Sequence, residues 1–335
     1  MKLDNETPLA AGTTVLLDKE GYETLLITVK GTYLFGSREK LELAQEQVPV
    51  QWTDEYYGEP SQSSIKYEGD IALFKNGTDV VLNGHAYAPG GNVRRIDAIL
   101  RVGPLNKNVR VFGDRVWEKT LGIHHISDPA PFEKLPLLWE RSFGGADQTN
   151  SNPKNHGCES RNPVGTGYRA KRTQQVEGIR LPNLEDPRQL IGDWTDRPEP
   201  AGFGFIGRDW EPRRGYAGTY NEAWTKTRSP LLALDFNERY YQGAHPSMVS
   251  QSFLNGDEVI EGEHLSSKGP FRYKLPGVHP KVAVSIGVRL ENVAAQFDTL
   301  IIEPDFFRVI LIWRGRLRVH RRLYSVKSVE VRFDN

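Results

Sequence analysis

Two carboxylates near the C-terminus have the spacing of a catalytic pair. Glu303 and Asp305 are two residues apart, and on an extended chain their side chains would lie on one face about 7 Å apart. That separation falls in the range used by glycosidases that invert the sugar carbon. Pro304 lies between them, however, and indicates a strand end, where acidic side chains are ordinarily solvated. The sequence favours solvated acids over a catalytic pair.

The single cysteine is the next candidate. His156 precedes Cys158 by two residues and could serve it as a base, although catalytic pairs are normally assembled by the fold rather than by adjacency in the sequence. His124, His125, His156 and Cys158 could in principle supply mixed ligands to zinc, but no recognised ligand spacing supports such a site. We therefore expect no catalytic residue, no metal and no cofactor.

A glycine pattern resembles a dinucleotide-binding loop. Gly202-Phe203-Gly204-Phe205-Ile206-Gly207 matches G-x-G-x-x-G, but it follows a proline-rich stretch rather than a strand. It also leads into Arg208-Asp209-Trp210-Glu211-Pro212, whereas the nucleotide motif requires a helix at that point. We predict an aromatic loop that packs on the core.

A basic stretch near the C-terminus indicates a partner surface. Residues 306–335 contain 8 Arg+Lys and 2 acidic residues, and basic side chains occupy every second position at Arg314, Arg316, Arg318, His320 and Arg322. On a regular strand they share one face and form a positive stripe that suits an acidic partner. The alternative is a solvated edge whose charges prevent unwanted strand pairing.

Aromatic residues are concentrated before this stretch. Six fall within 22 positions: Phe203, Phe205, Trp210, Tyr216, Tyr220 and Trp224. Aromatic and arginine side chains are typical of binding hot spots, and aromatic side chains also fill cores. We expect most of these six to pack in the core and the exposed ones to contribute to a partner site. The predicted partner-binding residues are Arg314, Arg316, Arg318, Arg322, Trp210, Tyr216 and Tyr220.

Alternation of apolar and polar residues predicts strands in both terminal parts of the chain. In the N-terminal part the expected strands are 13–17, 25–35, 79–87, 96–102 and 109–112, and 25–35 should bury one face. In the C-terminal part they are 282–290, 299–303, 307–313, 316–324 and 326–333. Arg314-Gly315 is the expected tight turn of a basic hairpin. A helix should start near Thr219, where Thr219-x-x-Glu222 has capping-box spacing, and should end before Pro230.

Glycine and proline set the middle of the chain apart. They fill 20 of the 90 positions from 141 to 230, against 33 of 245 elsewhere, so long regular elements are not expected there. We predict a mainly β fold with antiparallel sheets packed as a sandwich or an open barrel, and few short helices. Residues 1–335 should form a single domain, with an N-terminal β part at 1–140, an ordered-loop region at 141–270 and a C-terminal β part at 271–335.

Composition excludes several classes of protein. The 43 Lys+Arg and 43 Asp+Glu give zero formal charge, which argues against a general nucleic-acid binder. No run of about 20 apolar residues spans a membrane, and the first residues lack the pattern of a secretory signal. With one cysteine, no intrachain disulfide can form. We expect a cytoplasmic protein without nucleic-acid or membrane partners.

Several short strings, in order along nearly the whole chain, resemble a bacterial family encoded beside the spike and toxin genes of type VI secretion systems. The strings are Asn5-Glu6-Thr7-Pro8, Val102-Gly103-Pro104, Trp139-Glu140-Arg141-Ser142-Phe143-Gly144-Gly145, Arg161-Asn162-Pro163-Val164-Gly165-Thr166-Gly167, Leu181-Pro182-Asn183-Leu184-Glu185-Asp186-Pro187, Pro200-Ala201-Gly202-Phe203-Gly204, Tyr216-Ala217-Gly218-Thr219-Tyr220 and Asp298-Thr299-Leu300. Members of that family are regarded as effector adaptors or chaperones.

The resemblance implies a cytoplasmic, non-enzymatic carrier that holds a cognate toxic effector and helps to load it onto a spike of VgrG and PAAR-type proteins. A carrier that must release its cargo needs an extended, partly polar interface, which suits the local charge patches. Two alternatives stay open. One is a carbohydrate- or cell-wall-active hydrolase with Glu303 and Asp305 in a cleft, and the other is a structural component of the secreted spike.

Overall fold

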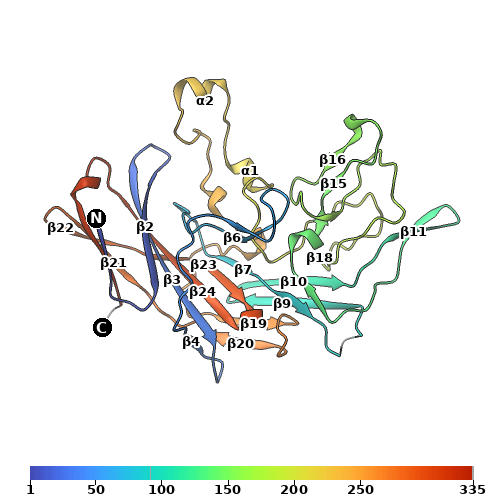
Figure 1. Ribbon diagram of the computed structural model, residues 1–335, viewed down its shortest axis with the longest axis horizontal. Coiled ribbons are helices and arrows are strands. Elements are labelled where there is room, and N and C mark those ends of the chain that lie inside the picture. Colours follow the sequence, from blue (N-terminus) through green and yellow to red (C-terminus); the bar gives the residue numbers. More distant parts are fainter. Residues whose placement is uncertain (91, 334–335) are drawn as a thin grey trace.

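The computed structural model describes residues 1–90 and 92–333 and consists mainly of β-strands joined by long loops (Figure 1). Among these described residues, strands account for 39% and helices for 9%, with two short α-helices. Several antiparallel sheets are present, and within the described residues none closes into a barrel. The prediction of a mainly β fold with few short helices is confirmed.

The largest sheet joins the two ends of the chain. Its strands, in spatial order, are β2 (Ala10–Leu17), β3 (Glu23–Phe35), β24 (Arg308–Arg318), β23 (Gln296–Glu303) and β7 (Asp79–Leu82), with β4 (Leu41–Leu43) paired to the end of β3. Neighbours are antiparallel except β7, which runs parallel to β23. The N- and C-terminal parts therefore share one sheet, with β3 and β24 at its centre.

Two further sheets complete the main framework. A five-stranded sheet has the order β18 (Leu184–Glu185), β10 (Leu105–Phe112), β9 (Arg95–Val102), β19 (Val259–Glu263) and β20 (Phe271–Lys274). A four-stranded sheet has the order β1 (Lys2–Asn5), β25 (Val326–Arg332), β21 (Lys281–Ile286) and β22 (Arg289–Val293). One hydrophobic core contains buried side chains from all three sheets. The region expected to consist of loops thus supplies β18 and β19 to a central sheet.

The remaining elements are short. Two-stranded pairs are β5 (Glu55–Tyr56) with β6 (Ile65–Tyr67), β8 (His85–Tyr87) with β13 (Lys134–Pro136), β11 (Trp117–Thr120) with β12 (Ile123–Ile126), β14 (Phe143–Gly144) with β17 (Thr166–Gly167), and β15 (Ala146–Asp147) with β16 (Gly157–Cys158). The helices are α1 (Arg213–Tyr216) and α2 (Glu222–Thr227), and the 3-10 turns are η1 (Trp139–Arg141), η2 (Pro153–Asn155), η3 (Glu238–Tyr241), η4 (Pro246–Met248), η5 (Pro304–Phe306) and η6 (Leu323–Ser325).

The expectation that the strand at 25–35 buries only one face is wrong. Every residue of β3 from 24 to 33 is buried, because a loop covers the face that carries its polar residues. Thr28 donates its hydroxyl hydrogen to the carbonyl oxygen of Asp70 at 3.0 Å. Lys30 donates to the Asp70 carboxylate at 2.9 Å, and the Thr32 amide donates to Gln47 at 2.7 Å. Polar partners inside the fold make both faces of this strand interior.

The predicted turn at Arg314-Gly315 is also wrong. β24 continues through both residues, with Gly315 opposite Ile27 of β3, and a Cβ at Gly315 would approach Val293 to 2.8 Å. Glycine at this position permits close packing rather than a turn. The basic segment through Arg318 is therefore the end of one long strand and not a hairpin. The strand expected at 316–324 is wrong beyond Arg318, because β24 ends there and η6 (Leu323–Ser325) follows.

Two other expected strands are each divided. Residues 79–87 form β7 and β8, and residues 282–290 belong to β21 and β22, which meet at Gly287 with φ of +61°. The predicted helix exists as α2, but its N-terminal cap is Asn221, whose side chain accepts from the Trp224 amide. Thr219 instead donates its amide and hydroxyl hydrogens to Asp235 at 2.9 and 2.7 Å.

The recurring glycine strings of the middle region have structural roles. Asn162 is fully buried, and its side-chain amide donates to the carbonyl oxygens of Trp139 and Phe143 at 2.8 and 3.0 Å. This joins the string at 161–167 to the string at 139–145, which also pair through β14 and β17. Phe203 and Phe205 are 1% and 2% exposed, so the prediction that the G-x-G-x-x-G segment packs on the core is confirmed.

Candidate functional site

The carboxylates of Glu303 and Asp305 have separate hydrogen-bond partners. Glu303 is 0% exposed and accepts hydrogen bonds from the Tyr67 hydroxyl and from Arg308 Nε. Asp305 accepts from the Tyr87 hydroxyl at 2.7 Å and is 2.6 Å from His85 Nδ1. Burial raises the pKa of Asp305, but these two hydrogen bonds outweigh it and lower the pKa overall. The expectation that both acids are solvated is wrong for Glu303.

The histidine and cysteine candidates do not form a reactive pair. His156 Nε2 hydrogen-bonds to the backbone oxygen of Asn150 at 2.8 Å. Cys158 is an exposed residue. Partial desolvation of its thiol and the charge of Glu159 raise the pKa of the thiol, which disfavours the nucleophilic thiolate. Within residues 1–90 and 92–333, no group of three or more His, Cys, Asp or Glu side chains could hold a metal ion.

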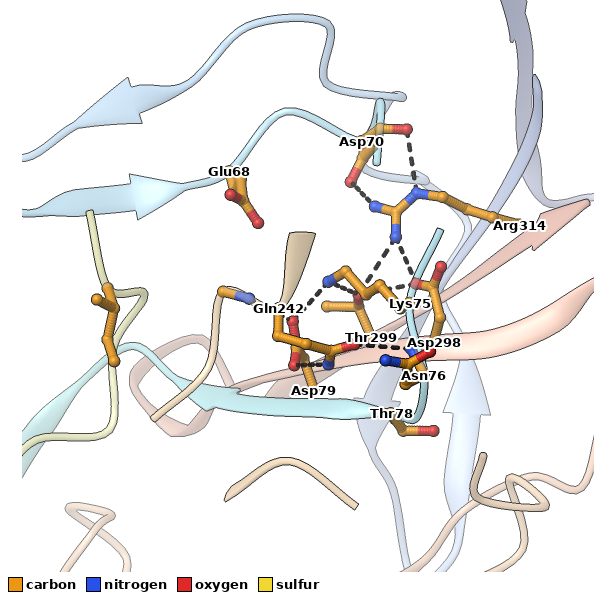
Figure 2. A network of polar contacts seen from close by, with 12 residues as sticks. Glu68, Asp70, Lys75, Asn76, Thr78, Asp79, Gln242, Asp298, Thr299 and Arg314 are labelled. Carbon is orange, nitrogen blue, oxygen red and sulfur yellow. Dashed lines mark hydrogen bonds and ion pairs between the residues drawn. The ribbon is translucent and has the colours of Figure 1, made fainter. Parts of the chain in front are cut away.

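A buried network of charged side chains lies where the large sheet meets the middle region (Figure 2). Arg314, on β24, is 8% exposed and donates to the carboxylate of Asp298 and to the backbone oxygen of Asp70. Its guanidinium also lies 3.5 Å from the Asp70 carboxylate, which Lys30 contacts from the other side. Burial alone would lower the pKa of Arg314, but the two aspartates raise it, so the side chain stays charged.

A second part of the network is centred on Asp79. This carboxylate is 0% exposed and accepts from Lys75 Nζ at 2.6 Å, from Gln242 Nε2 at 2.6 Å and from the Gly243 amide at 2.7 Å. Lys75 also donates to Thr299 at 2.9 Å. Gln242 and Gly243 belong to the ordered-loop region at 141–270, called the middle region here, so Asp79 connects that region to the sheet through β7.

A third part is centred on Glu68. Arg213 and Arg208 donate to its carboxylate at 2.6 and 3.1 Å. Burial alone would raise the pKa of Glu68, but Arg213, Lys75 and Arg208 outweigh it and hold the pKa at about 2. Arg213 begins α1 and Glu68 follows β6, so this ion pair joins the middle region to the segment after β6.

The buried charges of the network balance. The cations are Lys30, Lys75, Arg213 and Arg314, and the anions are Glu68, Asp70, Asp79 and Asp298, four of each sign. A buried ion is tolerated when it is paired and hydrogen-bonded. Because the charges cancel and each has partners, the network does not need a ligand, and we interpret it as the anchor that positions the middle region against β24.

Beyond this anchor along β24 lies a groove, defined here as the surface hollow of about 650 Å³ at the exposed end of the strand. One wall comes from β24 and the β2–β3 turn and includes Arg316, Arg318, Lys19 and Glu20. Residues 232–241, including Glu238 and Tyr241, supply another part of the lining. A smaller hollow of about 300 Å³ adjoins it and shares three lining residues, Leu73, Phe74 and Arg316.

The predicted arginine stripe is therefore divided by burial. Arg314 is inside the network and is not a surface residue, because the segment at 70–79 covers it. Arg316 and Arg318 are exposed and line the groove. Arg318 forms ion pairs with Asp18 at 2.6 Å and Glu20 at 3.1 Å. Arg322 pairs with Glu291 at 3.1 Å and does not line the groove.

Arg316 differs from its neighbours. Its guanidinium lies 3.9 Å from the centre of the Phe74 ring, and no carboxylate in the described part of the chain lies within ion-pair distance of it. Partial burial lowers the pKa of this guanidinium, but arginine stays protonated at neutral pH. An exposed cation fixed on an aromatic ring is suited to bind an anionic group of a partner.

The three predicted aromatic residues have different environments. Trp210 is 4% exposed and packs edge-on against Trp139, so it is a core residue and not a surface residue. Tyr216 is half-buried and lines a separate hollow of about 400 Å³. Tyr220 is 47% exposed and packs edge-on against Trp224. Phe74, Glu238 and Tyr241 line the groove but have no local sequence signal that would have identified them.

The chain belongs to a family of uncharacterized proteins conserved in bacteria (DUF2169), whose model matches residues 20–314. Comparison with curated proteins and with solved structures gave no match. The described residues contain no helix with the length and hydrophobicity needed to cross a bilayer.

Proposed function

We propose that this protein is a non-enzymatic cytoplasmic adaptor or chaperone that binds a cognate type VI secretion effector and assists its loading onto a spike of VgrG- and PAAR-type proteins. The ordered series of short strings from Asn5 to Leu300 supports this proposal through its resemblance to such adaptors. In the structure, an exposed groove with a fixed arginine provides a surface on which a protein partner could dock.

Arg316 is the observation that carries the proposal. Its planar guanidinium can donate two hydrogen bonds to one carboxylate, and Phe74 already restricts its orientation. When a partner supplies an acidic side chain here, the Arg316 side chain loses little conformational entropy, because it is already held in place before binding. Arginines on aromatic rings are frequent among residues that dominate binding energy.

The groove has mixed charge, which suits a selective interface. Its lining contains the acidic residues Asp18, Glu20, Asp235 and Glu238 and the basic residues Lys19, Arg316 and Arg318. A partner must match this alternation, since like charges brought together across an interface cost binding energy. We therefore expect the bound segment to carry an acidic residue opposite Arg316 and a basic residue near Glu238.

Affinity purification of the tagged protein from its native host, followed by mass spectrometry, tests the proposal. The wild type should recover a toxin-domain protein or a spike protein. Arg316→Glu should reduce that recovery at least tenfold, because a hot-spot residue is replaced by one of opposite charge. The paired variant Arg316→Glu with Arg318→Glu should reduce recovery further.

Arg172→Glu is the matched control. Arg172 is also exposed, its guanidinium has no ion pair among the described residues, and it lies in the 141–200 part of the chain, outside the groove. The same change of charge there should leave recovery unchanged, and thermal unfolding should be similar for both variants. Equal recovery with wild type and Arg316→Glu would exclude the groove as the interface. Recovery of no partner at all from wild type would contradict the adaptor function.

A further inference from the structure

A second hollow lies at the other end of the central strand pair. It has a volume of about 680 Å³ and is lined by the end of β3, by β20 and by the turn after η5. Arg308 is opposite Leu34 in the β3–β24 pair, whereas Arg316 is opposite Leu26. Eight residues of strand separate these two positions, so the second hollow lies about 26 Å from the Arg316 groove.

Four aromatic rings line this hollow. Phe35 stacks on Tyr273 with ring centres 4.4 Å apart and contacts Phe271 and Phe307 at 5.2 and 6.5 Å. Phe35, Tyr273 and Phe307 are only half-buried. The hollow therefore presents ring surface to solvent, which can pack against an apolar side chain of a partner.

The charges around the hollow leave two cations without a carboxylate. Arg101 pairs with Glu263 at 2.7 Å, and Arg272 pairs with Glu261 at 3.0 Å and with Glu39 at 2.7 Å. These pairs use all three acidic residues of the lining. The two other basic residues of the lining, Arg38 and Lys268, are exposed and have no ion pair in the part of the chain that the structure describes. The uncompensated charge of the hollow is positive.

The backbone at the hollow is held in unusual conformations. Phe307 has φ of +51° and Arg38 has φ of +52°. A left-handed conformation is unfavourable for a non-glycine residue and persists where the surrounding structure fixes it, often at functional positions. At Phe307 the carbonyl oxygen accepts from the Phe35 amide at 2.7 Å. Lys268 Nζ lies 4.0 Å from the centre of the same ring, so the ring and the cation are positioned together.

We propose that this hollow is a second docking site, which binds an acidic peptide segment of a partner protein that also carries an aromatic or aliphatic side chain. The apolar side chain packs on Phe35 and Tyr273, and the acidic side chains pair with Arg38 and Lys268. Because this site is distant from the Arg316 groove, both can be occupied at once. The chain can then bridge two proteins.

Selection of peptides against the purified full-length protein tests this site without knowledge of the natural partner. A displayed random peptide library is panned on the wild type, and recovered peptides are retested against Arg38→Glu with Lys268→Glu, against Arg316→Glu and against Arg172→Glu. We expect a group of peptides with Asp or Glu near an aromatic or aliphatic residue. Their binding should fall at least tenfold in the double variant only.

Further variants separate charge from folding. Arg38→Lys with Lys268→Arg keeps both charges and should retain binding, and each single reversal should weaken it. Arg38, Lys268, Arg316 and Arg172 are exposed and have no ion pair among the described residues, so thermal unfolding should change little. The proposal is overturned if no recovered peptide depends on Arg38 and Lys268, or if the dependent peptides lack acidic residues. Neither result depends on the Arg316 groove, so failure here is distinct from failure of the adaptor function.

Discussion

Replacement of Asp79 by asparagine should strongly destabilise the protein, because it breaks the buried network at its most enclosed ion pair. Asp79 is 0% exposed and Lys75 is 3% exposed. The side-chain nitrogen of asparagine cannot accept a hydrogen bond, and the neutral amide no longer compensates the charge of Lys75. The single asparagine oxygen and Thr299 then remain as acceptors for a buried ammonium group that has lost its paired carboxylate.

The magnitude follows from this burial. Removal of one partner from a buried ion pair costs about 3–5 kcal/mol, because the other charge is left uncompensated. Asp79→Asn also weakens the hydrogen bonds from Gln242 and Gly243, which connect the middle region to the sheet. A domain is stable by about 5–15 kcal/mol in total, so this variant should unfold at a much lower urea concentration than the wild type.

Urea unfolding followed by tryptophan fluorescence measures this effect, with Lys75→Met and Asp79→Asn combined as the matched control. The combined variant removes both charges and should recover at least half of the free energy lost in the single variant, since the ammonium no longer needs a partner. The reasoning is refuted if Asp79→Asn costs less than about 1 kcal/mol, or if the combined variant is no more stable than the single one.

Three other predictions concern pH and packing. The pKa of Glu68 is about 2 in the folded protein, below its value in the unfolded chain, so its contribution to folding stability is complete above about pH 4.5 and is lost as the pH falls toward 2. Glu68→Gln should therefore be less stable than the wild type at pH 7 but lose less stability between pH 5 and 3. Parallel urea-unfolding profiles of the two proteins over this pH range would contradict this. Burial lowers the pKa of Lys107 to about 8, so its charge destabilises the fold below that pH. Lys107→Met should raise the free energy of unfolding by about 1–3 kcal/mol at pH 7, and this gain should shrink from pH 8 to 10.5. A lower free energy of unfolding for the variant at pH 7 would contradict the prediction. Asn162→Ala leaves the carbonyl oxygen of Phe143 without this donor and leaves that of Trp139 with the Ser142 amide alone. The change should cost about 1–3 kcal/mol, so an unchanged melting temperature would refute the structural role of Asn162.

The sequence predicted the strands well because alternation reflects a local property, the two faces of an extended chain. Leu25 to Phe35 is the clearest case, and β3 covers that range. Its second buried face was not predictable, because Asp70 and Gln47 supply the polar partners from distant segments. Alternation shows which residues share a face, and it does not show what covers that face.

The same limit applies to the candidate site. Arg314, Arg316 and Arg318 do alternate along one strand, but the segment around Asp70 covers the first and leaves the other two exposed. Arg314-Gly315 between two apolar runs suggests a tight turn, and nothing local contradicts it, because the cross-strand partner of Gly315, Ile27, lies almost 290 positions earlier in the chain. Phe74, which orients Arg316, has no sequence feature that links it to β24.

Isothermal titration calorimetry tests the central claim most directly. It measures the affinity of the purified wild type, Arg316→Glu and Arg172→Glu for the partner recovered from the host. The account predicts that Arg316→Glu weakens binding at least tenfold, equivalent to about 1.4 kcal/mol or more. Arg172→Glu should bind as tightly as the wild type. Equal affinity of Arg316→Glu and wild type would contradict the assignment of this groove as the partner-binding surface.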